Sequence, residues 1–309
     1  MPRTARVKSL DGSGWYHVCA RTAGAVDEYP LDAPRYRRKL LGLIELFCKV
    51  YRCEVAGFCV MGNHYHLVAR FDEQVELTRE ELYQRASLIY PKKLLDGWLK
   101  HKWERFNERV FDLSEFMRNV QAAFGRWFNQ TTGRRGRFWA ERFKSTMLED
   151  EEAVMDCLLY IELNPLRAGI SERPEEYDGS SLYHREIKKD RWLVPITELI
   201  GRKRRADAVR DYKARVYYRG LEATAANQAV IPGHVVRAEE ARGFETRGAF
   251  AKRWRHFVDG LALGSEEFIR TQLDRMRAEG RYLRRRNPIL QLDGRHATLR
   301  EQRSNAAGF

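Results

Sequence analysis

Apolar residues follow two different spacings along this chain, and these spacings predict its secondary structure. Apolar residues at every second position, or in short continuous runs, predict strands, whereas apolar residues three or four positions apart predict helices. The predicted strands are residues 14–22, 54–61, 64–70 and 137–148, and the predicted helices are residues 34–51, 78–106, 113–129 and 150–164. With the charged stretch 72–112 taken as a helical insertion, the order β-α-β-β-α-β-α is typical of an α+β protein with a ferredoxin-like split βαβ antiparallel sheet.

Local signals mark several ends of these elements. Gly62-Asn63 is a turn-forming pair that would join two strands into a hairpin. Asp112 and Glu115 have the spacing of a capping box at the start of the helix 113–129. Pro165 disfavours the helical conformation of the residue before it, so the helix that begins near residue 150 is expected to end at Asn164.

Two histidines lie at the start of the predicted strand 64–70. Because side chains alternate between the two faces of a strand, His64 and His66 should point to one side of the sheet and Tyr65 to the other. Two neighbouring imidazoles on one face are a natural pair of metal ligands. The same spacing also fits two half-exposed histidines without a ligand, so the interpretation as a metal site depends on a second element.

The second element is the helix 150–164, which carries a tyrosine and an asparagine one helical turn apart. Leu158 and Ile161 belong to its apolar stripe, whereas Tyr160 and Asn164 lie on another face. A tyrosine at the edge of the core and an asparagine that ends the helix are the structural alternative. The functional alternative is a phenol that attacks a DNA phosphodiester, which yields a covalent phosphotyrosine and a released 3′-hydroxyl.

The two elements together resemble the single-tyrosine HUH nucleases, and the segment Tyr-Ile-Glu-Leu-Asn-Pro-Leu-Arg-Ala-Gly at 160–169 resembles the REP-associated tyrosine transposases. Trp15-Tyr16-His17-Val18 followed by Arg21 is similar to the first strand of that family. The run from Gly57 to His66 is similar to its central hairpin, and residues 137–144 are similar to its fourth strand. The resemblance covers roughly residues 14–185 in the order that the family shows.

The resemblance implies an HUH nuclease fold and a DNA transposase that cuts and rejoins single strands beside palindromic repeat hairpins. It implies Tyr160 as the nucleophile, with His64, His66 and Asn164 as the ligands of a divalent metal. Two imidazoles and one amide suit Mg²⁺ or Mn²⁺ with open positions for phosphate oxygens. Single-stranded or hairpin DNA would be the partner, and the protein would act as a monomer or a homodimer.

The charge of the chain supports a nucleic-acid partner. It has 56 Lys and Arg against 43 Asp and Glu, a net charge of +13, and a basic excess favours phosphate binding. Five basic residues and one acid lie between Arg134 and Lys144, interleaved with aromatic residues that would stack unpaired bases. A solvated basic face is the alternative. The expected DNA-binding residues are Arg21, Arg134, Arg135, Arg137, Phe138, Trp139, Arg142, Lys144 and Arg167.

The length suggests two units, a nuclease domain at 1–190 and a basic, mainly helical extension at 191–309 that would also bind DNA. The five cysteines form no Cys-x-x-Cys pair, and no stretch is long and apolar enough to span a membrane, so a cytoplasmic protein that associates with the nucleoid on DNA is expected. Another possible function is that of a domesticated DNA-binding regulator that keeps the fold without strand transfer, although such a regulator needs none of the residues His64, His66, Tyr160 and Asn164.

Overall fold

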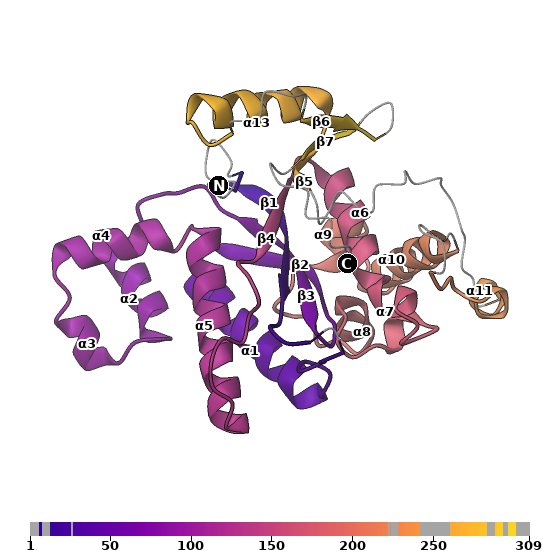
Figure 1. Ribbon diagram of the computed structural model, residues 1–309, viewed down its shortest axis with the longest axis horizontal. Helices are drawn as coiled ribbons and strands as arrows, with labels where there is room; N and C mark the ends of the chain where they lie inside the picture. Colours follow the sequence, from indigo (N-terminus) through magenta and orange to yellow (C-terminus); the bar gives the residue numbers. More distant parts are fainter. Residues whose placement is uncertain are drawn as a thin grey trace.

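The computed structural model is an α+β protein built on one mostly antiparallel sheet of seven strands (Figure 1). It describes residues 6–7, 13–25, 27–221, 223, 228–241, 260–282, 288–292 and 296–300. The strands are β1 Gly14–Arg21, β2 Cys53–Val60, β3 His64–Phe71, β4 Lys144–Leu148, β5 Gly260–Gly264, β6 Ile289–Gln291 and β7 Ala297–Arg300. Their order in the sheet is β2-β3-β1-β4-β5-β7-β6, and only the β4–β5 pair is parallel.

The first four strands follow the predicted order of elements. Helix α1 (Pro34–Val50) connects β1 to β2, and helix α5 (Leu113–Thr132) precedes β4. Asp112 caps α5 by accepting hydrogen bonds from the backbone N–H groups of Ser114 and Glu115, as its position predicts. The predicted strand 137–148 was too long at its start, because β4 begins only at Lys144.

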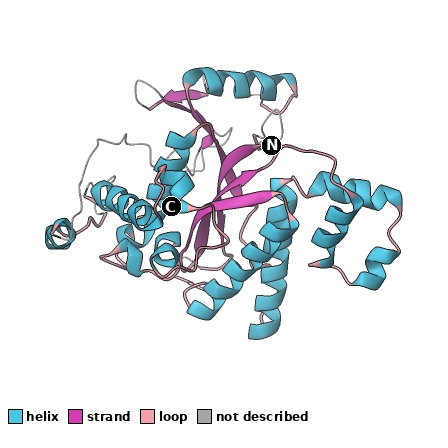
Figure 2. Cartoon of the chain, turned by 180° about the vertical axis from the view of Figure 1, so that it is seen from behind, coloured by secondary structure: helices cyan, strands magenta, loops and turns pink. Residues whose placement is uncertain are grey.

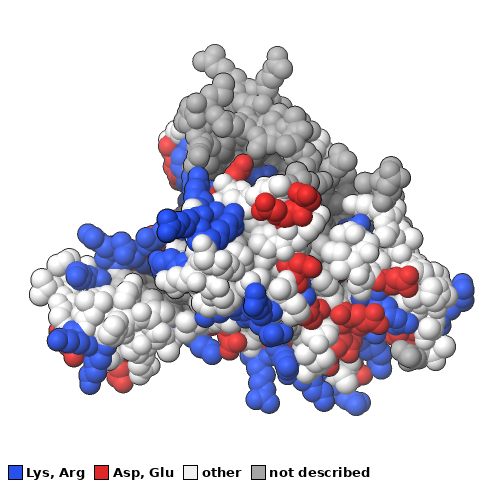
Figure 3. All heavy atoms as spheres, turned by 60° about the horizontal axis from the view of Figure 1, so that its bottom comes forward, with Lys and Arg blue, Asp and Glu red and all other residues white. Residues whose placement is uncertain are grey.

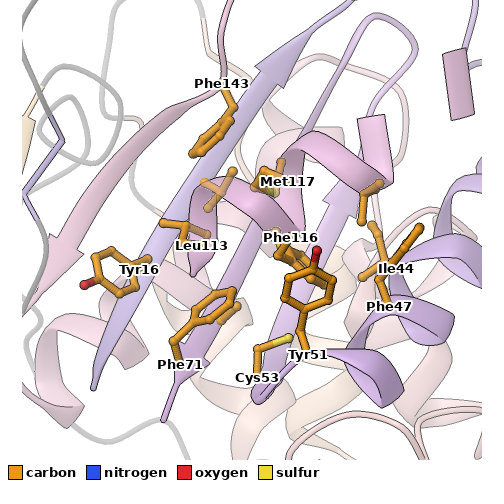
Figure 4. Packing of buried hydrophobic residues seen from close by; sticks show 14 of the residues in the cluster. Tyr16, Ile44, Phe47, Tyr51, Cys53, Phe71, Leu113, Phe116, Met117 and Phe143 are labelled. Atoms are coloured by element: carbon orange, nitrogen blue, oxygen red, sulfur yellow. The ribbon is translucent and has the colours of Figure 1, made fainter. Parts of the chain in front are cut away.

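The two faces of this sheet carry different layers of helices. Tyr16 and Val18 of β1 point towards α1 and α5, and Figure 4 shows this core with Tyr16, Phe71 and Phe116 between the strands and the helices. The opposite face packs against helix α6 (Glu151–Glu162), whose buried residues form a second core with Val68. The strand alternation therefore separates a purely structural face from the face that carries the histidines.

The charged stretch after β3 forms three short helices instead of the single long helix that its composition suggests. These are α2 Arg79–Ser87, α3 Lys92–Asp96 and α4 Lys100–Arg109. Figure 2 shows them as an arm beside the body of the molecule, and their aromatic residues pack on one another. Trp98 and Trp103 lie with their ring centroids 4.6 Å apart. Gly97 lies between α3 and α4, where the helical pattern is interrupted.

The chain beyond residue 190 shares the sheet and the second core with the first part, so the expected boundary at 190 does not separate two cores. The helices among its described residues are α9 Ile196–Ile200, α10 Arg205–Gly220, α11 Gly233–Glu240 and α13 Glu266–Ala278. In its described residues this part has more helix than strand, and the strands β5, β6 and β7, which the sequence does not predict, extend the sheet from β4. Ser265 caps α13 by accepting a hydrogen bond from the Phe268 N–H, as predicted.

Short elements after the tyrosine helix hold it against the sheet. They are α7 Asn164–Arg167, the 3₁₀ turn Pro174–Glu176 and α8 Ser181–Glu186. Arg185 of α8 is fully buried. Its guanidinium donates to the Ala56 carbonyl of β2 at 2.8 Å and to the Val194 carbonyl at 3.2 Å, and it pairs with Asp190 at 3.3 Å. Arg185 thus ties three segments of the second core together.

Replacing Arg185 with Met should lower the free energy of unfolding by about 3 kcal/mol, because two buried carbonyl groups lose their donor. Arg205→Met is the matched control, since Arg205 contacts the same Asp190 at 2.8 Å but its side chain is 39% exposed. That change should cost less than about 1 kcal/mol. Urea unfolding of both variants measures the difference, and equal losses would contradict this role of Arg185.

Among the described residues, no helix is long and apolar enough to cross a membrane.

Candidate active site

Two histidines of β3 and the tyrosine of α6 meet on the face of the sheet that α6 covers. The ring centroid of His66 lies 5.1 Å from that of His64 and 5.7 Å from that of Tyr160. The strand alternation and the position of α6 therefore bring together three of the side chains that the sequence singled out. Their chemical roles stay predictions.

Burial keeps the two imidazoles neutral. His66 is 2% exposed, and burial, followed by the charges of His64 and His17, holds its pKa well below the usual value. Burial and the neighbouring Arg21 lower the pKa of His64 to about 4. Both rings are thus in the neutral form near pH 7, which is the form that binds metal ions.

Each of the two histidines has its Nδ1 atom against a polar partner. Nδ1 of His64 lies 2.8 Å from Oδ1 of Asn63. Because that amide oxygen only accepts, His64 donates from Nδ1 and carries its lone pair on Nε2. Nδ1 of His66 lies 2.9 Å from Nε2 of His17, a buried histidine of β1. The sequence predicts Asn63 in the hairpin turn, whereas it does not predict His17 as a member of the site.

The only signal for His17 in the sequence is its position on the first strand. His17, Cys19 and Arg21 are spaced two apart, so they share one face of β1. In the sheet, β1 pairs with β3 so that Cys19 lies opposite His66 and Arg21 opposite His64. Without this register the sequence cannot tell which residues of the two strands are neighbours.

The end of the tyrosine helix differs from the expectation. Helix α6 ends at Glu162, and Asn164 begins the short helix α7 with Pro165 in its first turn. Proline is tolerated there because its missing N–H has no partner in a first turn. Asn164 is half-buried, and its Nδ2 donates to the Ile161 carbonyl at 3.4 Å. Asn164 therefore remains adjacent to the end of the tyrosine helix.

Within the described part of the chain, no three His, Cys, Asp or Glu side chains are grouped so that they hold a metal ion together. The predicted third ligand, Asn164, is not one of these residue types. Two neutral imidazoles with Nδ1 engaged suit a divalent metal that completes its coordination with water or phosphate, and Asn164 as the third ligand stays a prediction.

Glu162 lies between Tyr160 and Asn164 in the sequence but has different partners. It is fully buried, it accepts hydrogen bonds from the hydroxyls of Ser181 and Tyr212, and the Tyr212 bond measures 3.1 Å. Burial raises the pKa of its carboxyl to about 7, and the bond to Ser181 opposes that change. Glu162 thus joins α6 to α8 and α10, and these contacts account for its burial.

Several basic residues lie close to the histidines and to Tyr160. Arg21 lies opposite His64, and Lys144 of β4 lies opposite Cys19, so both belong to the histidine face of the sheet. Burial lowers the pKa of the Arg167 guanidinium to about 10, while nearby Tyr160 raises it and the charge of Arg219 lowers it. Arg167 therefore lies near Tyr160 and also near Arg219 of α10, a residue that the sequence does not assign to the site.

The aromatic residues expected to stack bases belong instead to the hydrophobic core. Phe138 is 3% exposed, and its ring centroid lies 4.5 Å from that of Phe128. Trp139 packs on Tyr65 and donates from Nε1 to the Gln121 carbonyl at 2.9 Å. The burial of Phe138 contradicts the stacking role expected for it, whereas Trp139 is half-buried and its expected role stays a prediction. A sequence pattern of aromatic residues between arginines does not show whether the rings are buried or exposed.

The arginines of the same segment have different surroundings. Arg134 donates to the Ala23 carbonyl at 3.1 Å, which fixes the segment against the end of β1. Arg135, Arg137 and Arg142 are exposed to solvent. Figure 3 shows one face of the molecule, on which Lys and Arg side chains gather in several groups. The exposed arginines remain available to a phosphate backbone.

No family model matches the chain, and no curated protein matches it. Among solved structures, the chain is similar to that of a REP-associated tyrosine transposase bound to a REP hairpin. The two are 14% identical, with a TM-score of 0.37, and the match covers 63% of this chain and 88% of the other.

Proposed function

We propose that this protein is a single-tyrosine DNA strand transferase of the HUH type, related to the REP-associated tyrosine transposases. It would cleave and rejoin single-stranded DNA next to a palindromic hairpin through a 5′-phosphotyrosine. The observation that carries the proposal is the meeting of Tyr160 with His64 and His66 on one face of the sheet. The order of motifs between residues 14 and 185 adds support from the sequence.

The proposed reaction needs only one nucleophile from the chain. The phenol oxygen of Tyr160 attacks the phosphorus, a bond between phosphorus and that oxygen forms, and the bond to the 3′ oxygen breaks. The phenol proton is lost, and the departing 3′ oxygen takes up a proton as it becomes a hydroxyl. Because one phosphodiester replaces another, the reverse attack by a 3′-hydroxyl can rejoin a strand.

His64 and His66 would hold a divalent metal through their Nε2 atoms, with Asn164 as the amide ligand. When bound, Mg²⁺ or Mn²⁺ would neutralise charge on the phosphate and assist departure of the 3′ oxygen. Asn63 would keep the Nδ1 proton of His64 in place. Arg167 near the phenol would favour the negative charge that develops on the Tyr160 oxygen and on the phosphate.

A cleavage assay with labelled DNA tests the proposal. The protein is incubated with Mn²⁺ and hairpin DNA that carries single-stranded flanks and a label at either end, and the products are separated on a denaturing gel. We expect the 3′-labelled fragment to migrate with the protein and the 5′-labelled fragment to carry a hydroxyl end. A chelator should prevent both products. Two unlinked DNA fragments would instead indicate hydrolysis by water and contradict the phosphotyrosine.

Arg167→Gln should weaken binding of hairpin DNA by about tenfold at low salt and reduce the salt dependence by roughly one counterion. The matched control is Lys49→Gln, since Lys49 is exposed on α1, which covers the opposite face of the sheet. Fluorescence anisotropy at several salt concentrations measures both variants. An equal loss in the two variants would mean that Arg167 contributes only to the general charge.

A further inference from the structure

The buried histidine of β1 lies beside the proposed metal ligand and the proposed nucleophile. His17 is 1% exposed, and its ring stacks on that of His66 with centroids 5.1 Å apart and an angle of 12° between the planes. Its centroid lies 6.1 Å from that of Tyr160, in an edge-on arrangement. None of the roles that the sequence predicts for individual residues explains why His17 lies beside His66 and Tyr160.

The contact between His17 and His66 restricts which ring nitrogen of each residue carries the proton. Nε2 of His17 and Nδ1 of His66 are 2.9 Å apart, so one of these atoms must donate and the other accept. If His66 binds a metal through Nε2, its proton lies on Nδ1. Nε2 of His17 must then be the acceptor, and His17 carries its own proton on Nδ1.

A hydrogen-bond partner on the second nitrogen is common among metal-binding histidines, because it fixes both the rotation and the tautomer of the ring. Asn63 stands in this relation to His64 at 2.8 Å. The pairing of β1 with β3 supplies the equivalent partner for His66, since Cys19 lies opposite His66 and His17 is two residues earlier. Each of the two predicted ligands thus has a polar partner at Nδ1, which is Asn63 for His64 and His17 for His66.

We propose that His17 is a positioning residue that accepts the Nδ1 proton of His66 and thereby presents the Nε2 atom of His66 to the metal. This inference rests on the proposed function, because it needs a metal at His64 and His66. His17 would hold no metal itself. Its contribution would be to metal affinity, through the orientation of His66, and not to DNA binding.

Two substitutions separate this role from a purely structural one. Gln at position 17 can present its amide oxygen near the place of the imidazole Nε2 atom, whereas Leu fills a similar space without an acceptor. Calorimetric titration of the full chain with Mn²⁺, without DNA, gives the affinity of each variant. We expect His17→Leu to lose about 10- to 100-fold and His17→Gln to stay within about threefold of the wild type.

Hairpin binding in the presence of a chelator should be the same in both variants and the wild type. His17→Asn serves as a second variant without the acceptor in reach, in case His17→Leu does not fold. Unchanged Mn²⁺ affinity in the variants that lack the acceptor would overturn the positioning role and leave the proposed function standing. Equal losses in the Gln and Leu variants would also overturn it, because they would indicate that the acceptor atom at position 17 does not set the metal affinity. If the wild type binds no Mn²⁺, or binds it equally after His64→Ala, the proposed metal site fails together with this inference.

Discussion

Replacing Tyr160 with Phe is expected to abolish the covalent protein–DNA adduct and to leave hairpin binding within about twofold of the wild type. The substitution removes one oxygen atom, which is the proposed nucleophile. The aromatic ring stays, so its packing near His66 and His17 is kept. The free energy of unfolding should change by less than about 1 kcal/mol.

Tyr29→Phe is the matched control for this experiment. Tyr29 is 58% exposed, and its ring lies near Gly62 at the hairpin turn before His64. The control should form the adduct at the wild-type rate. An adduct that persists in Tyr160→Phe would assign the nucleophile to another residue, whereas loss of the adduct in both variants would indicate a general effect of changing tyrosines near the site.

Substitution of His64 or His66, the proposed metal ligands, by Ala should also abolish metal-dependent cleavage, but the two variants should differ in stability. His66 is buried in the middle layer and hydrogen-bonded to His17, so His66→Ala should cost about 2–4 kcal/mol by leaving a cavity and an unpaired nitrogen. His64 lies half-buried at the start of β3, and its loss should cost about 1 kcal/mol.

His101→Ala provides the control, since His101 is exposed on α4 in the arm. Calorimetric titration with Mn²⁺, DNA cleavage and urea unfolding are measured on all three variants. His64→Ala is the more informative substitution, because it should remove the metal from a protein that remains folded. Wild-type Mn²⁺ affinity and cleavage in His64→Ala would show that the metal site lies elsewhere.

Much of the structure around the site follows from local patterns. The period-two alternation places His64 and His66 on one face, and the capping residue Asp112 marks the start of α5. The contacts between segments are different, because they depend on the register of strands distant in the sequence. His17 meets His66 across 49 positions, and a single histidine on a strand gives no indication of such a partner.

Two other differences between the predicted and the observed structure also arise because contacts between distant segments cannot be predicted from local sequence. The segment from Gly260 to Gly264 reads as a break between helices because its ends are glycines, yet it pairs with β4 across more than a hundred residues. Phe138 lies between arginines, and that pattern gives no information about burial, which depends on packing against Phe124 and Phe128 of α5. Local composition is therefore a weak guide to which aromatic residues are exposed at the surface.

A DNA-binding regulator with the same fold would bind hairpins but would form no covalent bond with them. Hairpin binding by itself thus does not distinguish a regulator from a transferase. The distinguishing property is the chemical bond between DNA and the side chain of Tyr160.

The most direct test is to map that bond by mass spectrometry. The protein is incubated with Mn²⁺ and hairpin DNA, the DNA is digested to a short remnant, and the adduct is cleaved with trypsin. The expected peptide is 145–167, in which Tyr160 is the only tyrosine. A nucleotide remnant on Tyr160 in this peptide is the result that the account predicts. A remnant on any other residue, or cleaved DNA without a protein-linked product, would contradict it.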